Sequence, residues 1–366
     1  MYFDHAATSP PSEKLNRSLY ELSSLSGYNP SSSHKLGLEQ RKRLENVRTQ
    51  IARLIGARPE EIYFTSGATE SNNLALQGFC YKKKGHIISS AVEHDSVEKN
   101  LDFLESQGFN VTRLSPKNLT SKQKILEHLR DDTILVSLMS VQNETGEHYG
   151  LDGLGEALRK KNIVYHRDCV QTFLKLPLDV NKEQVDMACF SSHKVGGLKG
   201  LGILYCRKGL SIEPLFFGGG QESNLRPGTE NTLAILALGH ILKEEKMQEN
   251  YNYIKKLNSY LGRGFVDLGG RLISPPDASP YILAVSFPVP SEVLSTALSL
   301  KGVYVSAGSA CHARSGKEAR IAPYLASQEL ARGMLRFSFS VENTHKEAET
   351  MLEILSQSLK ELKKYL

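Results

Sequence analysis

The chain of 366 residues has only five cysteines and no long apolar run, and each shortage excludes a class of protein. The five cysteines are an odd number with no C-x-x-C pair, which argues against a disulfide framework or a zinc knuckle and suits a reducing compartment. No apolar stretch approaches the roughly 18 residues of a membrane-spanning helix. The N-terminus, "MYFDHAATSP", has neither the basic nor the apolar region of a secretory signal, so we expect a mature cytoplasmic chain.

The sequence also lacks a large excess of one charge and the common nucleotide-binding fingerprints. Lysine and arginine number 45 against 40 acidic residues, and this net charge of +5 is scattered along the chain. We therefore expect no direct nucleic-acid or membrane partner. Neither G-x-x-x-x-G-K-[ST] nor G-x-G-x-x-G occurs. A hydrophobic content of 40% and this length are typical of a globular protein with two domains.

Helical and strand patterns alternate over the first two thirds of the chain. An amphipathic pattern covers residues 33–55, and further helix-like segments cover 96–107, 121–130 and 151–161. The expected strands are the apolar runs "EIYFT", "HIISS", "NVTRL", "TILVSLM", "NIVYH", "VDMACF" and "GILYC". This alternation predicts an α/β domain with a mostly parallel sheet and helices on both faces, at residues 15–235. Residues 1–14 and 236–366 are expected to form a smaller α+β domain.

Ligands of an open parallel sheet lie beyond the carboxyl ends of its strands, so the residues after each apolar run are candidates for chemistry. "SGATES" follows the first run and leads into a helix that begins near Ala68 or Thr69. The free backbone N–H groups of such a helix end, with the threonine hydroxyl, can hold a phosphate. The alternative is an ordinary helix cap with no ligand.

Two other strand ends carry an aspartate and a lysine. Asp168 and Gln171 lie in "RDCVQT", and Ser191, His193 and Lys194 lie in "SSHKVGG". A lysine at the end of a buried strand is unusual, because lysine is almost never buried without a partner. Desolvation lowers the pKa of a lysine and makes it a candidate nucleophile for an aldehyde. A phosphate cup, an aspartate for a ring nitrogen and a lysine for an aldehyde are the parts that hold pyridoxal phosphate.

Cys311 lies in "SAGSACHARSGK", a segment of small, polar and basic residues with no apolar neighbours to pack against. Nearby positive charge favours the reactive thiolate, and the alternative is an incidental loop thiol. The other four cysteines lie in or beside apolar runs and are expected to be buried hydrophobic residues: Cys80, Cys169, Cys189 and Cys206.

Nine segments together resemble the cysteine desulfurases of the NifS/IscS-like group, which are class V aminotransferase-fold enzymes. In chain order they are "FDHAATSP", "FTSGATESNNLA", "VEHDSV", "VQNETG", "YHRDCVQT", "SSHKVGGLKGLG", "LRPGTEN", "SAGSAC" and "LRFSFS". The resemblance implies a fold-type-I transferase that binds pyridoxal phosphate, and a homodimer. It also implies that the enzyme converts L-cysteine to L-alanine and carries the sulfur as a persulfide on Cys311, with no metal ion involved.

The resemblance assigns roles to the cofactor-site residues. Lys194 would bond the cofactor aldehyde, His94 would stack on its ring, Asp168 would keep the ring nitrogen protonated and Gln171 would hydrogen-bond the phenolic oxygen. The implied catalytic residues are Cys311, Lys194 and His94. The implied phosphate ligands are Ala68, Thr69, Ser191 and His193, with Thr229 reaching the phosphate of the neighbouring subunit.

Asn143 and Arg336 resemble the pair that binds the substrate carboxylate, a task that suits the arginine fork. Structural alternatives exist: His94 as a surface histidine, Asn143 as a turn residue and Arg336 as a strand-edge charge. The chain departs from the group at His312, at "GKEAR" and at "VGGLKG".

These departures leave the sulfur acceptor open between an iron–sulfur scaffold, a tRNA-thiolation protein and another protein. The alternative functions are another class V reaction, such as an aminotransferase, an epimerase or a selenocysteine lyase, and a non-catalytic homologue that assists assembly.

Overall fold

A computed structural model describes residues 1–149, 151–244, 246–307 and 319–364. Cys311 and its neighbours lie outside the described residues. The chain divides into a larger unit, residues 10–140 and 149–245, and a smaller unit, residues 1–9, 141–148 and 246–366. This division differs from the expected domains in its boundaries and in the short segment 141–148, which sequence patterns did not distinguish. None of the helices described is long and apolar enough to cross a membrane.

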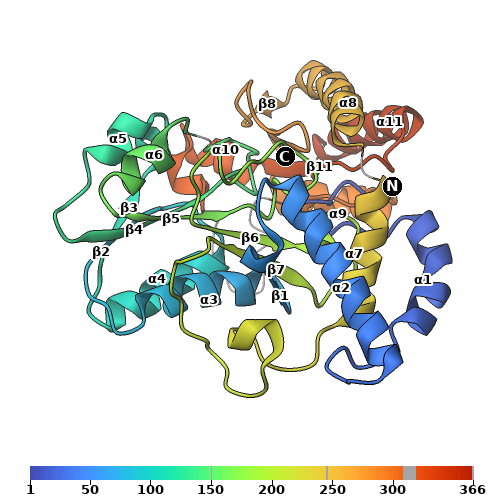
Figure 1. The fold of residues 1–366 in the computed structure, drawn as a ribbon. Coiled ribbons are helices and arrows are strands. Elements are labelled where there is room, and N and C mark those ends of the chain that lie inside the picture. Colours follow the sequence, from blue (N-terminus) through green and yellow to red (C-terminus); the bar gives the residue numbers. More distant parts are fainter. Residues whose placement is uncertain (150, 245, 308–318, 365–366) are drawn as a thin grey trace. The chain divides into compact units, whose positions relative to one another are not determined.

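The larger unit contains a seven-stranded sheet in the order β1-β7-β6-β5-β4-β2-β3 (Figure 1). Only β7 runs in the direction opposite to the other six strands, which confirms a mostly parallel sheet. Strands β2, β5, β6 and β7 are buried along their whole length, which explains why they appear in the sequence as continuous apolar runs. The strand bounds are β1 Ile62–Thr65, β2 His86–Ser90, β3 Asn110–Leu114, β4 Thr133–Met139, β5 Val164–Asp168, β6 Met187–Ser191 and β7 Gly202–Cys206.

Helices lie on both faces of this sheet, with α3 and α4 on one side and α5 and α6 on the other (Figure 1). The amphipathic pattern of residues 33–55 is confirmed as α2, whose Leu44, Val47 and Ile51 are buried. Helices α5 and α6 are shorter than the patterns predict. The bounds are α1 Glu13–Leu25, α2 Lys35–Leu54, α3 Ala68–Cys80, α4 Asp95–Ser106, α5 Lys122–Leu126, α6 Leu154–Arg159 and α7 Thr232–Glu244, with 3₁₀ turns η1 Pro59–Glu61, η2 Pro116–Asn118, η3 Ser192–Lys194 and η4 Gln221–Asn224.

The smaller unit is built on an antiparallel sheet in the order β10-β11-β9-β8. The N-terminal segment extends this sheet through bridges of Tyr2 to Tyr304 and of Asp4 to Ser338. One apolar core joins the sheet to its helices, and Phe265 packs on Phe287 and Phe337 within it. The bounds are β8 Arg271–Leu272, β9 Ile282–Ser286, β10 Ser306–Ala307, β11 Met334–Ser338, α8 Met247–Asp267, α9 Ser291–Leu300, α10 Gln328–Arg332, α11 His345–Leu362 and the 3₁₀ turn η5 Ala322–Tyr324.

The four cysteines expected to be core residues are buried, which confirms that prediction. Burial raises the pKa of the Cys80, Cys169 and Cys206 thiols to about 12, and it raises the pKa of Cys189 well above its usual value. These thiols stay protonated near neutral pH, so none of them is a nucleophile.

Candidate cofactor and substrate sites

The predicted chemistry of the larger unit converges on one edge of its sheet. Thr65 at the end of β1 pairs with Gly202 of β7, and Gly202 pairs with Ser191 at the end of β6. Asp168 at the end of β5 pairs with Cys189 of β6 and with Met139 at the end of β4. Strands β1, β4, β5 and β6 therefore all end at this edge, and "SGATES", "RDCVQT" and "SSHK" leave the sheet there.

Helix α3 begins where the phosphate cup is expected. Gly67 is its N-cap, and Ala68 and Thr69 form its first turn, with Thr69 exposed. A Cβ at Gly202 would overlap the backbone of Gly67, so only glycine permits this approach of β7 to the turn. Glu70 accepts a hydrogen bond from the Ser66 N–H at 2.7 Å and holds the turn closed. The helix end offers backbone N–H groups to an anion.

A chain of hydrogen bonds links Asp168 to His94. The buried Asn72 amide donates to Asp168 Oδ2 at 2.9 Å and to Ser96 Oγ at 2.8 Å. Nδ1 of His94 accepts from the Ser96 N–H at 3.1 Å and lies 2.9 Å from Ser96 Oγ. Because Nδ1 is the acceptor, the neutral ring carries its proton on Nε2. Asp168 Oδ1 also accepts from the Val170 N–H at 3.0 Å, so both carboxylate oxygens are fixed.

His94 is the N-cap of α4, and its side chain is exposed. The same imidazole therefore caps the helix and remains accessible to a ligand. The surface alternative and the stacking role are both compatible with this placement. The adjacent Glu93 is fully buried, and burial raises the pKa of its carboxyl to about 8. A protonated Glu93 adds no negative charge next to Asp168.

The segment after β6 places His193 and Lys194 in η3, half-buried, next to the buried Ser191. Burial, together with the positive charge of Lys194, Lys199 and Lys175, lowers the pKa of His193 to about 4. His193 is therefore neutral near neutral pH and acts as a single N–H donor. Gln171 is buried and accepts a hydrogen bond from Lys175 Nζ at 3.1 Å.

Thr229 is exposed and follows a turn that is unusually well fixed. Glu222, Ser223 and Asn224 in η4 all have left-handed φ angles of 46°, 57° and 66°. The carboxylate of Glu222 binds both terminal nitrogens of Arg48, at 2.7 and 2.9 Å, and accepts from the Phe64 N–H at 2.7 Å. This anchor holds an otherwise unfavourable backbone in place.

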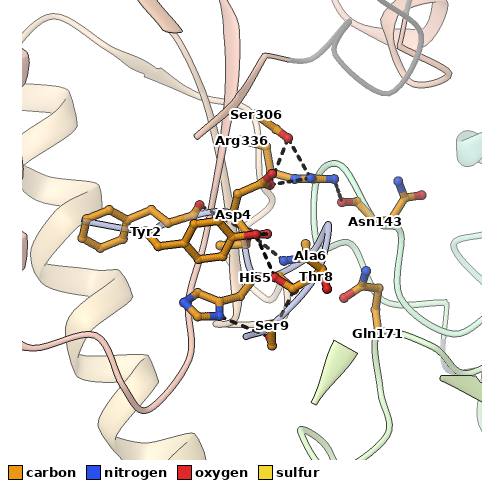
Figure 2. Close-up of polar contacts among 12 residues, drawn as sticks. Tyr2, Asp4, His5, Ala6, Thr8, Ser9, Asn143, Gln171, Ser306 and Arg336 are labelled. Carbon is orange, nitrogen blue, oxygen red and sulfur yellow. Dashed lines mark hydrogen bonds and ion pairs between the residues drawn. The ribbon is translucent and has the colours of Figure 1, made fainter. Parts of the chain in front are cut away.

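Figure 2 shows the polar contacts around Arg336 in the smaller unit. The buried guanidinium donates from Nη2 to Asp4 Oδ1 at 2.8 Å and to Ser306 Oγ at 3.0 Å, and from Nη1 to the backbone oxygen of Asn143 at 3.0 Å. Its Nε is buried and has no hydrogen-bond partner among the described residues. The structure thus brings Arg336 and Asn143 together, and Arg336 keeps a donor that a carboxylate could use.

Asn72, Ser96, Asp4, Ser306 and the Arg48–Glu222 pair were not identified from the sequence. Asn72 and Ser96 belong to segments that look like ordinary helix starts, and Asp4 is distant in the chain from the arginine it contacts. Arg48 and Glu222 could be recognised only from the ion pair that they form in the structure. In the described residues, no group of three histidine, cysteine or acidic side chains could hold a metal ion.

Known proteins resemble the chain along almost its whole length. The "Aminotransferase class-V" family profile matches residues 1–351. The chain is 37% identical to "Putative cysteine desulfurase IscS 1" of Bacillus subtilis (strain 168), over 99% of each chain. A solved "NifS-like protein" superposes with a TM-score of 0.90 at 33% identity, covering 98% of this chain and 99% of that one. The structure "SspA in complex with cysteine" has a TM-score of 0.83 at 32% identity, covering 94% of this chain and 99% of that one.

Proposed function

The chain belongs to the class V aminotransferase family, and from that premise we propose that it is a pyridoxal-phosphate-dependent cysteine desulfurase. The observation that carries the proposal is the convergence of Asp168 and "SSHK" at one sheet edge, in a chain whose full-length relatives are named cysteine desulfurases. The second candidate is another reaction of this family, an aminotransferase or a selenocysteine lyase. The non-catalytic alternative has no observation in its favour.

The donor set at the sheet edge fits pyridoxal phosphate. The start of α3 at Ala68 and Thr69, with Ser191 and the neutral His193, offers N–H and O–H donors to a phosphate. Lys194 supplies the amine that bonds the aldehyde, and Gln171 supplies an amide for the phenolic oxygen. The bound cofactor supplies an electron sink for the bonds of the substrate's α-carbon.

Asp168 would tune this electron sink through the ring nitrogen. Its carboxylate, fixed by Asn72 and the Val170 N–H, keeps a proton on the ring nitrogen and so keeps the ring electron-poor. His94 would stack on the ring of the bound cofactor, and the contact of its Nδ1 with Ser96 leaves the Nε2 proton available for transfer. Asn143 and Arg336 bind the carboxylate of cysteine.

Cys311 takes the sulfur. Its thiolate attacks the sulfur atom of the substrate cysteine, the carbon–sulfur bond breaks, and an S–S bond forms on Cys311. The carbon skeleton gains the proton and leaves as L-alanine, so L-cysteine and one thiol become L-alanine and one persulfide. The persulfide then passes to an acceptor protein, an iron–sulfur scaffold or a thiolation protein. The enzyme works as a homodimer in which Thr229 reaches the partner's phosphate, and its cytoplasmic location stays a prediction.

The Cys311→Ala variant tests this function. It should keep the yellow colour of bound cofactor and bind cysteine, and it should release almost no sulfide. In intact mass, the wild type should gain one sulfur atom on Cys311 after exposure to cysteine and lose it to dithiothreitol. Cys80→Ala, which removes one of the buried thiols, is the matched control and should desulfurate normally. Wild-type sulfide release by Cys311→Ala would instead favour a lyase on the same fold.

A further inference from the structure

Lys175 is a buried cation that has no assigned part in the proposed chemistry. Its side chain is buried, and its Nζ donates to Oε1 of Gln171 at 3.1 Å. An ammonium group can only donate hydrogen bonds, so the atom it contacts must be the amide oxygen of Gln171. This contact settles which way the amide is turned.

The backbone between the two residues is shaped to allow this contact. Leu174 has a left-handed φ of 57°, which is rare for a residue with a bulky side chain. The Lys175 N–H donates to the Thr172 oxygen at 3.0 Å, and the Leu176 N–H donates to the same oxygen at 3.0 Å. The tight turn after Gln171 therefore directs the chain back on itself. A strained conformation of this kind persists only where its surroundings hold it, and it is concentrated at functional sites.

We propose that Lys175 is a positioning residue of the cofactor site. Its ammonium group holds the amide oxygen of Gln171, so that the amide nitrogen is oriented to donate a hydrogen bond to the phenolic oxygen of pyridoxal phosphate. The inference rests on the proposed role of Gln171. Without the ammonium, the amide could flip and present its oxygen, which would repel the phenolic oxygen instead of donating to it. Lys175 itself makes no contact with substrate in this account.

The orientation of Gln171 has a spectroscopic consequence. An N–H donor on the phenolic oxygen withdraws negative charge from it, so the neighbouring nitrogen that Lys194 shares with the cofactor holds its proton less tightly. Loss of that donor should raise the pH midpoint of the cofactor's visible absorbance. Lys175, Lys194 and Lys199 all act on His193 through their positive charge, and Asp168 ends β5 three residues before Gln171. A control for net charge is therefore required.

Lys175→Met, loaded with pyridoxal phosphate, is the principal variant, because methionine keeps an unbranched apolar side chain in the buried position. Its absorbance midpoint should rise by about 0.5 to 1 pH unit relative to the wild type. Lys199→Met removes another positive charge near His193 from an exposed position and should shift the midpoint by less than about 0.2 unit. An unshifted midpoint in Lys175→Met overturns the proposal.

A double-variant cycle separates positioning from a direct effect of charge. In a Gln171→Met background there is no amide to orient, so adding Lys175→Met should move the midpoint no further. An equal shift in both backgrounds would show that the ammonium acts on the cofactor directly and would overturn the positioning role. If Lys175→Met does not fold, Lys175→Leu serves, because leucine also has no donor for the Gln171 oxygen, with the same required shift and the same overturning result. A wild-type protein without cofactor absorbance would contradict the proposed function itself, whereas a coloured protein without these shifts contradicts only the role of Lys175.

Discussion

Lys194 is the residue proposed to form the covalent bond with the cofactor. Lys194→Ala should bind pyridoxal phosphate without a covalent bond, because Lys194 is the only lysine in η3. After borohydride reduction, intact mass should show the cofactor attached to the wild type and absent from the variant. Lys199→Ala, five residues along the same segment, is the control and should be labelled like the wild type. Cofactor fixed to the Lys194→Ala chain would show that another lysine forms the bond.

Asp168 is expected to act through its charge, and Asn72 through the orientation of that charge. Asp168→Asn keeps the shape of the side chain but cannot hold a proton on the ring nitrogen, so kcat should fall by about 10²- to 10³-fold. Asn72→Leu removes one of the two groups that fix the carboxylate and the Ser96 contact, and the loss in kcat should be smaller. Steady-state kinetics with cysteine measure both. Near-normal turnover of Asp168→Asn would make this aspartate a structural residue.

His166 on β5 predicts a pH dependence of stability. Burial lowers the pKa of His166 to about 3, with Ser137 Oγ 2.8 Å from its Nδ1. The unfolded chain, with an ordinary pKa of about 6.5, binds the proton more readily, so stability is lost as the pH falls from about 6.5 toward 3. Between pH 7 and pH 5 the loss from this group is about 2 kcal/mol. His166→Gln should flatten this part of the urea-denaturation profile, and His345→Gln, an exposed control, should leave it unchanged.

At the scale of elements, the sequence predicted best where burial is strongest. The apolar runs predicted the seven strands, and the residues that follow these runs included Asp168 and Lys194. Helix α1 was not predicted, and Leu15 is its only buried residue. The reversed direction of β7 and the Asp4–Arg336 pair depend on contacts between distant segments, which no local pattern records.

The ion pair that anchors the turn η4 should contribute measurably to the stability of the fold. The Arg48–Glu222 pair is nearly buried, with side chains 11% and 2% exposed, and it holds three left-handed residues. Arg48→Met leaves the Glu222 carboxylate without its guanidinium, so unfolding free energy should fall by about 3 kcal/mol. Lys160→Met breaks an exposed ion pair with Glu156 and should change the free energy of unfolding by less than about 0.5 kcal/mol. Equal effects of the two variants in urea denaturation would show that the pair does not anchor the turn.

At the scale of the whole molecule, the proposed homodimer requires each site to combine residues of two subunits. Thr229 is exposed in the single chain, as expected of a side chain whose ligand lies in a partner. Thr229→Val should weaken cofactor binding about 10- to 100-fold, the usual effect of losing a hydrogen bond to a charged group. Sedimentation should show a dimer, and a fully active monomer would remove Thr229 from the site.

Mixed dimers decide whether Thr229 acts on the partner's cofactor. A dimer of one Lys194→Ala subunit and one Thr229→Val subunit contains one complete site if the threonine acts across the interface, because the intact lysine and the intact threonine then meet. Such mixed dimers, co-expressed and purified with two affinity tags, should therefore bind the cofactor at one site. They should show about half of the wild-type activity per dimer, because a two-fold dimer has two equivalent sites. A dimer of the wild type with a Lys194→Ala/Thr229→Val subunit is the reverse control, and its one lysine-containing site should bind the cofactor weakly. Restoration in the reverse control alone would show that the threonine serves its own subunit.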